Sequence, residues 1–494
     1  MLAMERGERI AVFGDFDVDG VTATAILSRA FKLLGKDVLP YIPHRVEEGH
    51  GLSLQAVEAM AREKVGLMVT VDCGVTSHQE IIAAAEAGID TIVTDHHLVP
   101  EGPPQACAVV DPRLPGSRYP FPHLTGAGLA LKLTEALMRR VGADDTLWRH
   151  LLMPLAALGT VADVAPLLDE NRSIVRQGLE DMRNSPLPGL MALLRSSGLE
   201  SRRLDSEAIA WVLAPRLNAA GRMDHANVSY QLLTGESEEE AAVLAATLEA
   251  QNKERQRVTE EAVGLAKASL VVEPLLMVGD PSFSPGIVGL VAGRLVEEFR
   301  HPAVVVSLGE DISRGSCRSI PEFDIGGALH QVAPRIGGFE RYGGHPQAAG
   351  FTVATDKLPA LHAELVAMAR ETLGEEASPP YLDVELELPL GNLPRDVYQI
   401  VQRMAPFGSA NPSPVFLSRN VQVVDMRHMG SNGSHVRLKL RDGGATWQAV
   451  AFRQGAAIPS DARFLDVVYT IEVDHWNGQD TLQLNILDTR ITKS

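Results

Sequence analysis

The sequence predicts an α/β protein with two α/β lobes joined by a long helix, and a small β-barrel at the C-terminal end. Three observations predict this class. Strand-like and helix-like segments alternate over residues 9–110, a polar helical pattern without proline runs over residues 237–270, and short alternating strands fill residues 380–494. A chain of 494 residues is long enough for about three domains of ~100–200 residues each.

The first lobe is predicted from apolar runs that alternate with helical segments. Strands that are each followed by a helix form a parallel, doubly wound sheet. Gly88 ends one of these helices, as glycine commonly does just after a C-cap. From residue 126 to about residue 233 the pattern is mainly helical. The expected strands are 9–13, 67–71, 89–94 and 106–110, and the expected helices include 21–34 and 78–87.

The long helix begins at Ser237, whose spacing from Glu240 matches a capping box. Its ~34 residues correspond to roughly 50 Å at 1.5 Å per residue. Its middle, residues 251–257, is polar on every side, which is typical of a helix that bridges two domains through solvent. A second α/β lobe is predicted from the segments that follow, a strand at 275–278, a helix at 286–299 and a strand at 303–307.

The last part of the chain has an all-β pattern. Residues 383–388 alternate apolar and polar side chains with period two, and Asn477-Gly478 is typical of a two-residue hairpin turn. Five or six short strands in a segment of this length fit a small barrel or a sandwich. The other alternating segments are 421–426, 435–440 and 446–452.

Composition limits the classes of function. The net charge of −18 argues against general affinity for nucleic acid, because basic surfaces supply that affinity. Residues 380–494 are nearly neutral, however, so the negative charge lies in residues 1–379, where bound metal would neutralise part of it. Three distant cysteines predict a reducing cytoplasm without a disulfide framework. No apolar run approaches the ~20 residues of a membrane helix, so we expect no membrane association.

Acids and imidazoles follow the predicted strands at the points where the strands end. Asp15, Asp17 and Asp19 follow the first strand, with alternating side chains in an extended or turning segment. Asp72 and His96 follow the next two strands. Ligands bind at the carboxyl edge of a parallel sheet, so these side chains are expected to lie close together. Carboxylates and imidazoles suit Mg²⁺ or Mn²⁺, and acids this close repel each other strongly without a cation.

Further candidates surround this set. Asp163 ends another apolar run, and two ions a few ångströms apart could activate a water and hold the leaving oxygen of a phosphoryl displacement. His97 need not bind the same ion as His96 and could instead contact phosphate or move a proton. Asp95 could orient a neighbouring histidine. Asp111 precedes a proline and is more simply interpreted as a turn residue.

Four strings carry these residues in order: GDFDVDG, VDCG, TDHH and LGTVADV. They resemble the four motifs of the DHH phosphoesterase superfamily. The downstream strings PRLNAAGRM, GIVGLVAGRL, SRGSCRS and YGGHPQAAGF resemble the RecJ family of single-strand-specific 5′→3′ exonucleases. MAPFGSANPSPVF resembles the opening of the OB-like barrel of that family. The resemblance runs over nearly the whole chain, and the ordered set of strings is highly specific.

The resemblance implies a domain organisation and a metal centre. It implies a DHH catalytic domain (1–235), a connecting helix (236–272), a DHH-associated domain that binds phosphate and DNA (273–375) and an OB-like barrel that binds single strands (376–494). It implies two Mn²⁺ or Mg²⁺ ions, with His97 in a catalytic or phosphate-contacting role. The implied metal ligands are Asp17, Asp19, Asp72, His96 and Asp163, with Asp15 as a further candidate.

Basic and glycine-rich segments are candidates for holding the DNA strand. Arg216 and Arg222 flank Asn218 among small residues, and guanidinium groups match phosphate oxygens bidentately. A salt bridge at a helix end is the alternative interpretation of this segment. The remaining candidates are Ser316, Arg318 and Ser319, in the string that resembles the phosphate-contacting segment of the family, and Gly344 and His345 in a glycine-rich turn. Ser284 stands where many relatives have a histidine.

Most aromatic residues of the barrel are expected in its core, and one or two are expected to stack on bases beside basic side chains. The aromatic candidates are Phe407, Phe416, Trp447, Phe452, Tyr469 and Trp476, and the basic ones are Arg427, Arg437, Lys439, Arg441 and Arg453.

The leading hypothesis is a monomeric, metal-dependent exonuclease that releases mononucleotides from single-stranded DNA in repair and recombination, with Asp95, His97, Arg216 and Arg222 as catalytic residues. A single-strand-binding protein and a helicase are expected partners. The alternatives are a DHH phosphodiesterase for oligoribonucleotides or small nucleotides, a catalytically silent replication scaffold, and a pure single-strand-binding module. Such phosphodiesterases are mostly shorter and lack the barrel, so residues 380–494 favour a long polymer. The scaffold predicts lost metal ligands, and the binding module leaves the acidic cluster unexplained.

Overall fold

The structure, a computed structural model, describes residues 1–99, 102–200, 204–374, 381–394, 396–430, 433–474 and 481–492. It contains two compact units. The first comprises Met1–Ala165 and Asp169–Pro379, and the second comprises Pro166–Leu168 and Pro380–Ser494. None of the helices in the described ranges combines the length and the apolar character that a membrane crossing requires.

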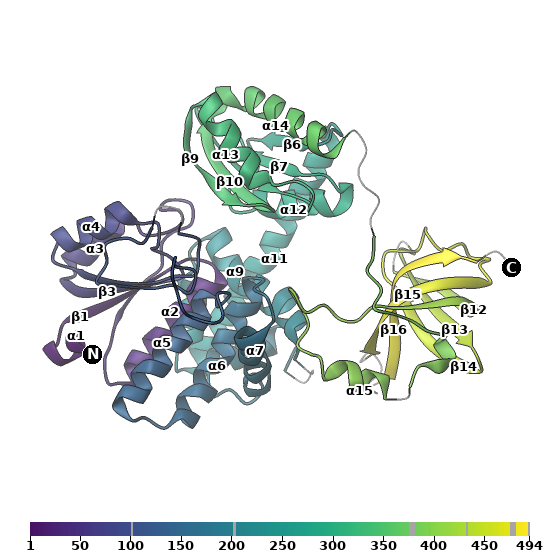
Figure 1. The fold of residues 1–494 in the computed structure, drawn as a ribbon, viewed down its shortest axis with the longest axis horizontal. Helices are drawn as coiled ribbons and strands as arrows, with labels where there is room; N and C mark the ends of the chain where they lie inside the picture. The colour runs from purple at the N-terminus through teal and green to yellow at the C-terminus, as the bar shows by residue number, and fades with distance from the viewer. Residues whose placement is uncertain are drawn as a thin grey trace. The chain divides into compact units, whose positions relative to one another are not determined.

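The N-terminal lobe of the first unit is built on a fully parallel sheet with the strand order β2-β1-β3-β4-β5. Helices α3 and α4 cover one face of this sheet, and α2 and α5 lie on the other (Figure 1). The carboxyl ends of β1, β3 and β4 therefore lie side by side at one edge, which confirms the doubly wound sheet expected from the sequence. The strands are β1 (Arg9–Gly14), β2 (Leu39–Tyr41), β3 (Val65–Val71), β4 (Asp90–Thr94) and β5 (Ala108–Val110).

Helix α2 (Val18–Leu33) begins three residues earlier than the sequence pattern indicated. Asp17 is its N-cap, with a side chain that accepts a hydrogen bond from the backbone N–H of Gly20 at 3.1 Å. The acidic segment is therefore not extended through Asp19, which lies in the first turn of the helix. The cap, rather than strand-like alternation, fixes the direction of the Asp17 carboxylate.

Helices α5, α6, α9 and α10 of this lobe lie against α2. A π-helical segment at Ala208–Leu213 leads directly into α9. The helices are α1 (Leu2–Arg6), α3 (Leu54–Arg62), α4 (His78–Glu86), α5 (Gly126–Val141), α6 (Asp145–Ala162), α7 (Asp169–Met182), α8 (Pro188–Ser196), α9 (Ala214–Met223) and α10 (Asn227–Thr234).

Helix α11 (Glu238–Ser269) joins the N-terminal lobe to a second α/β lobe (Figure 1). Its start is capped as predicted, because the Ser237 hydroxyl accepts a hydrogen bond from the Glu240 backbone N–H at 3.2 Å. The second lobe has a mixed sheet with the order β6-β7-β8-β10-β9, in which only β6 and β7 are parallel. Its elements are β6 (Leu276–Asp280), α12 (Val288–Phe299), β7 (Ala303–Ser307), β8 (Ile312–Arg318), α13 (Ile325–Ile336), β9 (Phe339–His345), β10 (Ala348–Ala354) and α14 (Leu358–Leu373).

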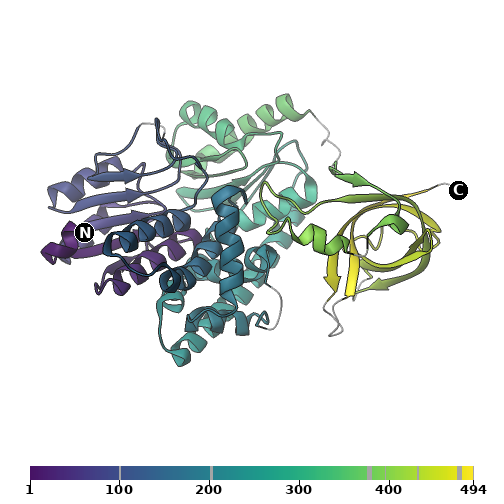
Figure 2. The ribbon, with the colours of Figure 1, turned by 60° about the horizontal axis from the view of Figure 1, so that its bottom comes forward.

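The second unit is a five-stranded barrel with the order β12-β13-β14-β16-β15, closed by pairing of β15 with β12 (Figure 2). This closure decides between the barrel and the sandwich that the sequence left open. Its elements are β11 (Leu386–Glu387), α15 (Val397–Gln402), β12 (Phe416–Met429), β13 (His435–Asp442), β14 (Ala445–Ala451), β15 (Phe464–Asp474) and β16 (Thr481–Ile491).

One prediction for the barrel turned out differently. Only Leu386–Glu387 of the expected strand 383–388 pairs, with the start of β12, and its apolar side chains Val384 and Leu386 are exposed. The alternation therefore does not reflect a buried face. The Asn477-Gly478 turn lies outside the described residues.

Candidate metal centre and phosphate-binding site

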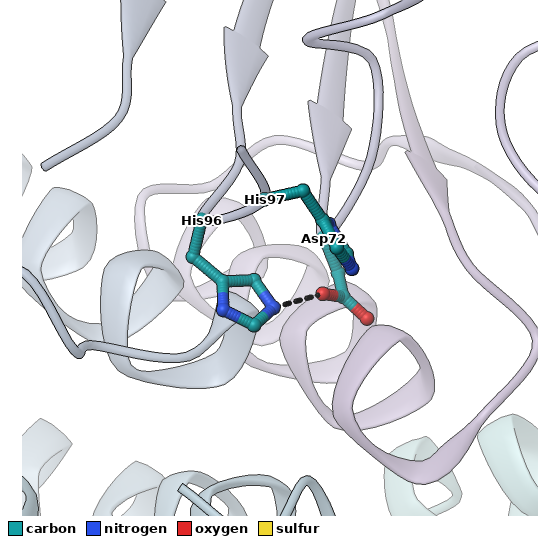
Figure 3. A group of neighbouring side chains, drawn as sticks. All are labelled: Asp72, His96 and His97. Carbon is teal, nitrogen blue, oxygen red and sulfur yellow. Dashed lines mark hydrogen bonds and ion pairs between the residues drawn. The ribbon is translucent and has the colours of Figure 1, made fainter. Parts of the chain in front are cut away.

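The ends of β3 and β4 bring Asp72, His96 and His97 together (Figure 3). The His96 imidazole Nε2 lies 2.9 Å from a carboxylate oxygen of Asp72 and 3.7 Å from one of Asp19. Asp163, the C-cap residue of helix α6, joins the same cluster. All of the acids and imidazoles predicted to bind metal therefore meet at one place.

The ligand atoms form three groups in which every atom lies within 4.8 Å of the others. The residues Asp72 and His96 each belong to two groups, so neighbouring ions could share ligands. One carboxylate oxygen of Asp15 is buried without a hydrogen-bond partner among the described residues. Oxygen donors with an imidazole fit a hard divalent cation such as Mn²⁺ or Mg²⁺. The groups are Asp72, His96 and His97; Asp19, His96 and Asp163; and Asp15, Asp17 and Asp72.

The carboxylates of the cluster lie so close together that their negative charges would repel each other, and a bound cation would reduce this repulsion. Burial, followed by the charges of the neighbouring acids, raises the pKa of Asp72 well above its usual value. Asp163 is solvent-exposed at one side, but desolvation by the surrounding protein and the charges of Asp19 and Asp17 raise its pKa to about 8. Such shifts are the expected result when several acids share one site.

Helix α5 fixes the position of Asp19. The Asp19 carboxylate accepts hydrogen bonds from the backbone N–H groups of Gly126 at 2.6 Å and Ala127 at 2.9 Å, in the first turn of that helix. Burial nevertheless raises its pKa to about 6. A Cβ on Gly126 would lie 2.5 Å from the Cβ of Asp72, so glycine is required where this helix approaches the cluster.

The two adjacent histidines have different environments. Burial and the positive charge of His97 lower the pKa of His96 to about 3, which leaves a neutral imidazole able to bind a metal. Burial also lowers the pKa of His97, but its 2.7 Å hydrogen bond to Asp95 and the charge of Asp95 raise it by more, to about 9. Asp95 also accepts from the backbone N–H of Val75 at 2.9 Å, which holds the carboxylate in place.

Two residues of the site were missed in the sequence. Arg45 lies over the ring of Phe16 at 4.6 Å, and His50 lies 3.0 Å from a carboxylate oxygen of Asp15. Both belong to the loop that follows β2, a strand of three residues that is too short to predict. The sequence signal that could have indicated this loop is the pair of glycines, Gly49 and Gly51, on either side of His50. Both have positive φ angles of 80°, as glycine commonly does in a tight loop.

A group of basic and small side chains lies on the second lobe, at the first turn of α12. Arg318 donates a hydrogen bond to the Ser316 hydroxyl at 3.3 Å. A Cβ on Gly289 would lie 2.9 Å from that hydroxyl and 3.1 Å from the Arg318 guanidinium, so glycine lets the helix start closely beside both. Arg222 of α9 reaches this region and donates to the Gly286 carbonyl at 3.1 Å. Guanidinium groups beside a helix N-terminus form an anion site.

Other predicted residues have structural partners. Arg216 forms an ion pair with Glu249 at 2.7 Å, which agrees with the salt-bridge interpretation of its segment. Ser319 donates to the Phe323 carbonyl at 2.6 Å, and Asp111 accepts from the Arg113 backbone N–H at 2.6 Å, as in a turn.

The remaining candidates lie on α9 and on the β9–β10 hairpin. Asn218 is part-buried on α9. Gly344 has a φ of 148°, and a Cβ there would lie 2.4 Å from the Ala348 carbonyl oxygen, so pairing of the strands explains this glycine. Burial, followed by the charge of His97, lowers the pKa of His345, which places that imidazole near the catalytic histidine candidate.

The barrel keeps most of its aromatic residues inside, as expected. Phe416 and Tyr469 are buried and stacked at 5.8 Å, and Phe407 and Trp447 pack partly against the core. Phe452 is the exception among the described candidates, with 52% of its surface exposed. Trp476 lies outside the described residues. The basic candidates Arg427, Arg437, Lys439, Arg441 and Arg453 lie on or beside strands β12, β13 and β14.

We expect the stability of the metal-free chain to fall between about pH 6.5 and about pH 8. The folded-state pKa values of Asp163 and His97 are raised, to about 8 and about 9, so the folded state binds more protons than the unfolded state in this window. Thermal unfolding in EDTA at the two pH values measures the change, and Asp163→Asn should make it smaller. A melting temperature that rises with pH in EDTA would contradict these environments.

Comparison with known proteins assigns the family. Three family models match the chain: the DHH family N-terminal domain over residues 9–160, the DHHA1 domain over 267–371 and the RecJ OB domain over 384–488. The single-stranded-DNA-specific exonuclease RecJ of Bacillus subtilis is 34% identical, and the match covers 99% of this chain but 62% of that relative. The RecJ of Escherichia coli is 32% identical, with 98% of this chain and 88% of the relative covered.

Solved structures agree with this assignment. The crystal structure of RecJ from Thermus thermophilus in complex with Mn²⁺ matches with a TM-score of 0.85 and 32% identity, over 100% of this chain and 70% of that one. A crystal structure of the same enzyme in complex with Mg²⁺ matches with a TM-score of 0.79. The parallel sheet, the second α/β lobe, the long helix and the closed barrel are all part of this likeness, and the chain belongs to the RecJ family.

Proposed function

We propose that this chain is a metal-dependent exonuclease that degrades single-stranded DNA from the 5′ end to mononucleotides. The observation that carries the proposal is the cluster of acids and imidazoles at the sheet edge, together with the basic group around Arg318 on the second lobe. The cluster fits the ions of a phosphodiester hydrolysis, and we propose that the basic group forms a pocket for a terminal phosphate. The relatives named above are single-stranded-DNA-specific exonucleases, and their solved structures contain Mn²⁺ or Mg²⁺.

Asp17, Asp19, Asp72, His96 and Asp163 would hold the ions, with Asp15 as a further ligand. When bound, such ions supply an activated water and neutralise charge on the phosphoryl oxygens. The bond between phosphorus and the 3′ oxygen of the terminal nucleotide breaks, and the water oxygen joins the 5′ phosphate of the shortened strand.

His97 and the arginines would act directly on the phosphate being cleaved. His97 is held protonated at neutral pH by Asp95, and it donates a proton or a hydrogen bond to an oxygen of that phosphate. Arg45 and Arg222 lie close enough to Asp17 for its charge to act on both, so they can add positive charge beside the ions. For Arg216 we propose a supporting role through its ion pair with Glu249.

The domain organisation follows the same proposal. Residues 1–235 carry the chemistry, 236–272 join the lobes, 273–375 hold the strand end, and 376–494 bind the strand further along. A cytoplasmic monomer that meets its substrate with a single-strand-binding protein and a helicase fits this activity.

Arg318→Ala should weaken use of 5′-phosphorylated DNA by about 10-fold or more, because a charge-assisted hydrogen bond is lost. DNA with a 5′ hydroxyl should be much less affected. Initial rates on the two substrates at limiting concentration measure the difference. Arg335→Ala on α13 is a matched control, since Arg335 is exposed and paired with Glu364. Equal losses on both substrates would remove the end-pocket assignment.

Phe452→Ala should weaken binding of a long single strand by about 1–3 kcal/mol, the contribution of one stacked base. Binding of a short oligomer that does not reach the barrel should be unchanged. Fluorescence anisotropy with both lengths measures this, and Val424→Ala is an exposed apolar control on β12. An unchanged affinity for the long strand would assign stacking to a different residue.

The substrate class is tested by incubating the full chain with Mn²⁺ and matched single-stranded DNA, single-stranded RNA, duplex DNA and a dinucleotide. The proposal expects the single-stranded DNA to be degraded fastest and EDTA to stop the reaction. Faster decay of RNA or of the dinucleotide would instead support a phosphodiesterase for oligoribonucleotides or small nucleotides.

A further inference from the structure

The loop between β2 and α3, residues 42–53, carries two side chains of the metal centre that its own lobe holds loosely. Arg45 lies 4.6 Å above the Phe16 ring, but it forms no hydrogen bond or ion pair with the described residues. His50 lies 4.4 Å from the same ring and 3.0 Å from an Asp15 oxygen. Since a cation–π contact contributes only about 0.5–2 kcal/mol, the position of Arg45 depends on the loop backbone that carries it.

Two arginines of the second lobe contact the tip of this β2–α3 loop. Arg314 on β8 donates a hydrogen bond from Nη1 to the Val46 carbonyl oxygen at 2.9 Å. Arg341 on β9 lies directly against Gly49, because a Cβ on that glycine would lie 2.7 Å from the Arg341 Nη1. Gly49 has a φ of 80°, so glycine both permits the turn and leaves room for the guanidinium group.

Each contact lies next to a side chain of the metal centre. Val46 directly follows Arg45, and Gly49 directly precedes His50. Consecutive Cα atoms are only about 3.8 Å apart, so a shift of the loop at either contact moves the side chain beside it. The second lobe therefore holds the loop at the two points that matter most for the metal centre.

The register of the second sheet places both arginines on one face. Arg314 and Arg341 lie opposite Thr352 on the two sides of β10. Along β8, Arg314, Ser316 and Arg318 alternate with buried residues, so they share that face. Arg314 and Arg318 are four residues, or ~13 Å, apart on the strand. One rigid strand thus joins the group around Arg318 to the β2–α3 loop.

Pairing with surface acids does not explain where these arginines lie. Neither Arg314 nor Arg341 forms an ion pair with an acid in the described part of the chain, although the net charge is −18. A guanidinium group can donate several hydrogen bonds in a fixed planar geometry, so it suits the exposed backbone of a loop.

We propose that Arg314 and Arg341 are positioning residues that hold the β2–α3 loop on the second lobe, so that Arg45 and His50 stay beside the metal cluster. The inference rests on the proposed function, because it concerns the proposed cleavage. Since Arg318 lies on the same strand as Arg314, a 5′ phosphate bound at Arg318 and the held loop keep a fixed spacing.

The first test measures hydrogen exchange of the loop in the full chain without DNA. The backbone N–H groups of Glu48 and Gly49 donate to the His44 carbonyl at 2.9 and 3.3 Å, so a peptide covering residues 42–53 reports on the loop. Arg314→Ala and Arg341→Ala should each make this peptide exchange about 5-fold faster.

The matched control for this test is Arg335→Ala, an exposed arginine of the same lobe that pairs with Glu364. It should leave the exchange of residues 42–53 unchanged. Unchanged exchange in both Arg314→Ala and Arg341→Ala would overturn the proposal, and this result does not depend on any activity.

The second test separates positioning from direct contact with DNA. Arg314→Ala should lower the single-turnover rate on single-stranded DNA in Mn²⁺ by about 10-fold. The affinity for that DNA, measured by anisotropy with Asp72→Asn present to prevent cleavage, should change by less than about 2-fold. If Arg314 bound a phosphate directly, the substitution would weaken binding and reduce the salt dependence of binding by about one ion, and that outcome overturns the proposal.

The third test asks whether Arg314 acts through Arg45. In protein that already carries Arg45→Ala, adding Arg314→Ala should slow cleavage by less than about 3-fold, because residues that act as a unit are not additive. A further loss of about 10-fold would show that the two arginines act independently, and the proposal would then be wrong.

Conservative replacement checks that lost folding does not cause these effects. Arg314→Lys can still donate to the Val46 carbonyl, so it should recover most of the rate and restore slow exchange of the loop. Thermal unfolding of each variant measures its stability. Failure of the proposed function would look different, because the parent protein would then not cleave single-stranded DNA, whereas the exchange test would still give its result.

Discussion

Asp72→Asn should abolish cleavage, with a fall in rate of about 10³-fold or more, because a lost ion removes several kcal/mol of transition-state stabilisation. Asp72 contributes to two of the three ligand groups and lies 2.9 Å from His96. Asparagine keeps the shape of the side chain but cannot supply the charge. Steady-state rates on 5′-phosphorylated single-stranded DNA in Mn²⁺ measure the effect.

The same substitution separates metal binding from folding. Burial and the neighbouring acids raise the pKa of Asp72 well above its usual value, so a charged carboxylate is disfavoured there without metal, and the neutral Asp72→Asn variant should unfold in EDTA at nearly the parent temperature. Mn²⁺ should raise the melting temperature of the parent and not of the variant, because a ligand that binds the folded state stabilises it. Asp111→Asn is the matched control, a buried acid in a turn that should keep both activity and the Mn²⁺ effect. Full activity of Asp72→Asn would refute the metal site.

His97→Gln should lower the cleavage rate by about 10²–10⁴-fold, the usual contribution of a positioned acid or base. The Mn²⁺-dependent rise in melting temperature should remain, because His96 and the acids still supply ligands.

His96→Gln should lose both activity and most of the Mn²⁺ effect. The two adjacent histidines would then have different roles, His96 as a metal ligand and His97 as a proton or hydrogen-bond donor. Asp95→Asn should also lower the cleavage rate, but by less than His97→Gln, because it disturbs the 2.7 Å hydrogen bond that orients the His97 imidazole. Loss of the Mn²⁺ effect in His97→Gln would make His97 a ligand instead.

Strand ends and the long helix were predictable from the sequence because their signals are local. Apolar runs ended in Asp72 and His96, and parallel pairing of β3 with β4 brings those ends together. The Ser237 cap and the lack of proline marked the start and the length of α11. The direction of Asp19 was not predictable, because it depends on N–H groups of α5, more than a hundred residues further along the chain.

Partners that lie far apart in the sequence explain the other differences. Arg216 carried the same signal as Arg222, but Arg216 forms an ion pair with Glu249 of a different helix. Arg45 and His50 were missed because the strand before their loop has only three residues. The edge segment before β12 alternated although its apolar side chains are exposed, and only two of its residues pair with β12.

The central claim is tested most directly with one single-stranded DNA oligomer labelled at its 5′ end in one sample and at its 3′ end in another, incubated with the chain and Mn²⁺. The account predicts that the 5′ label appears at once as mononucleotide, while the 3′ label stays on DNA that shortens step by step. Release of the 3′ label first, or internal fragments carrying either label, would contradict a strand held by its 5′ phosphate with the next linkage at the metal centre.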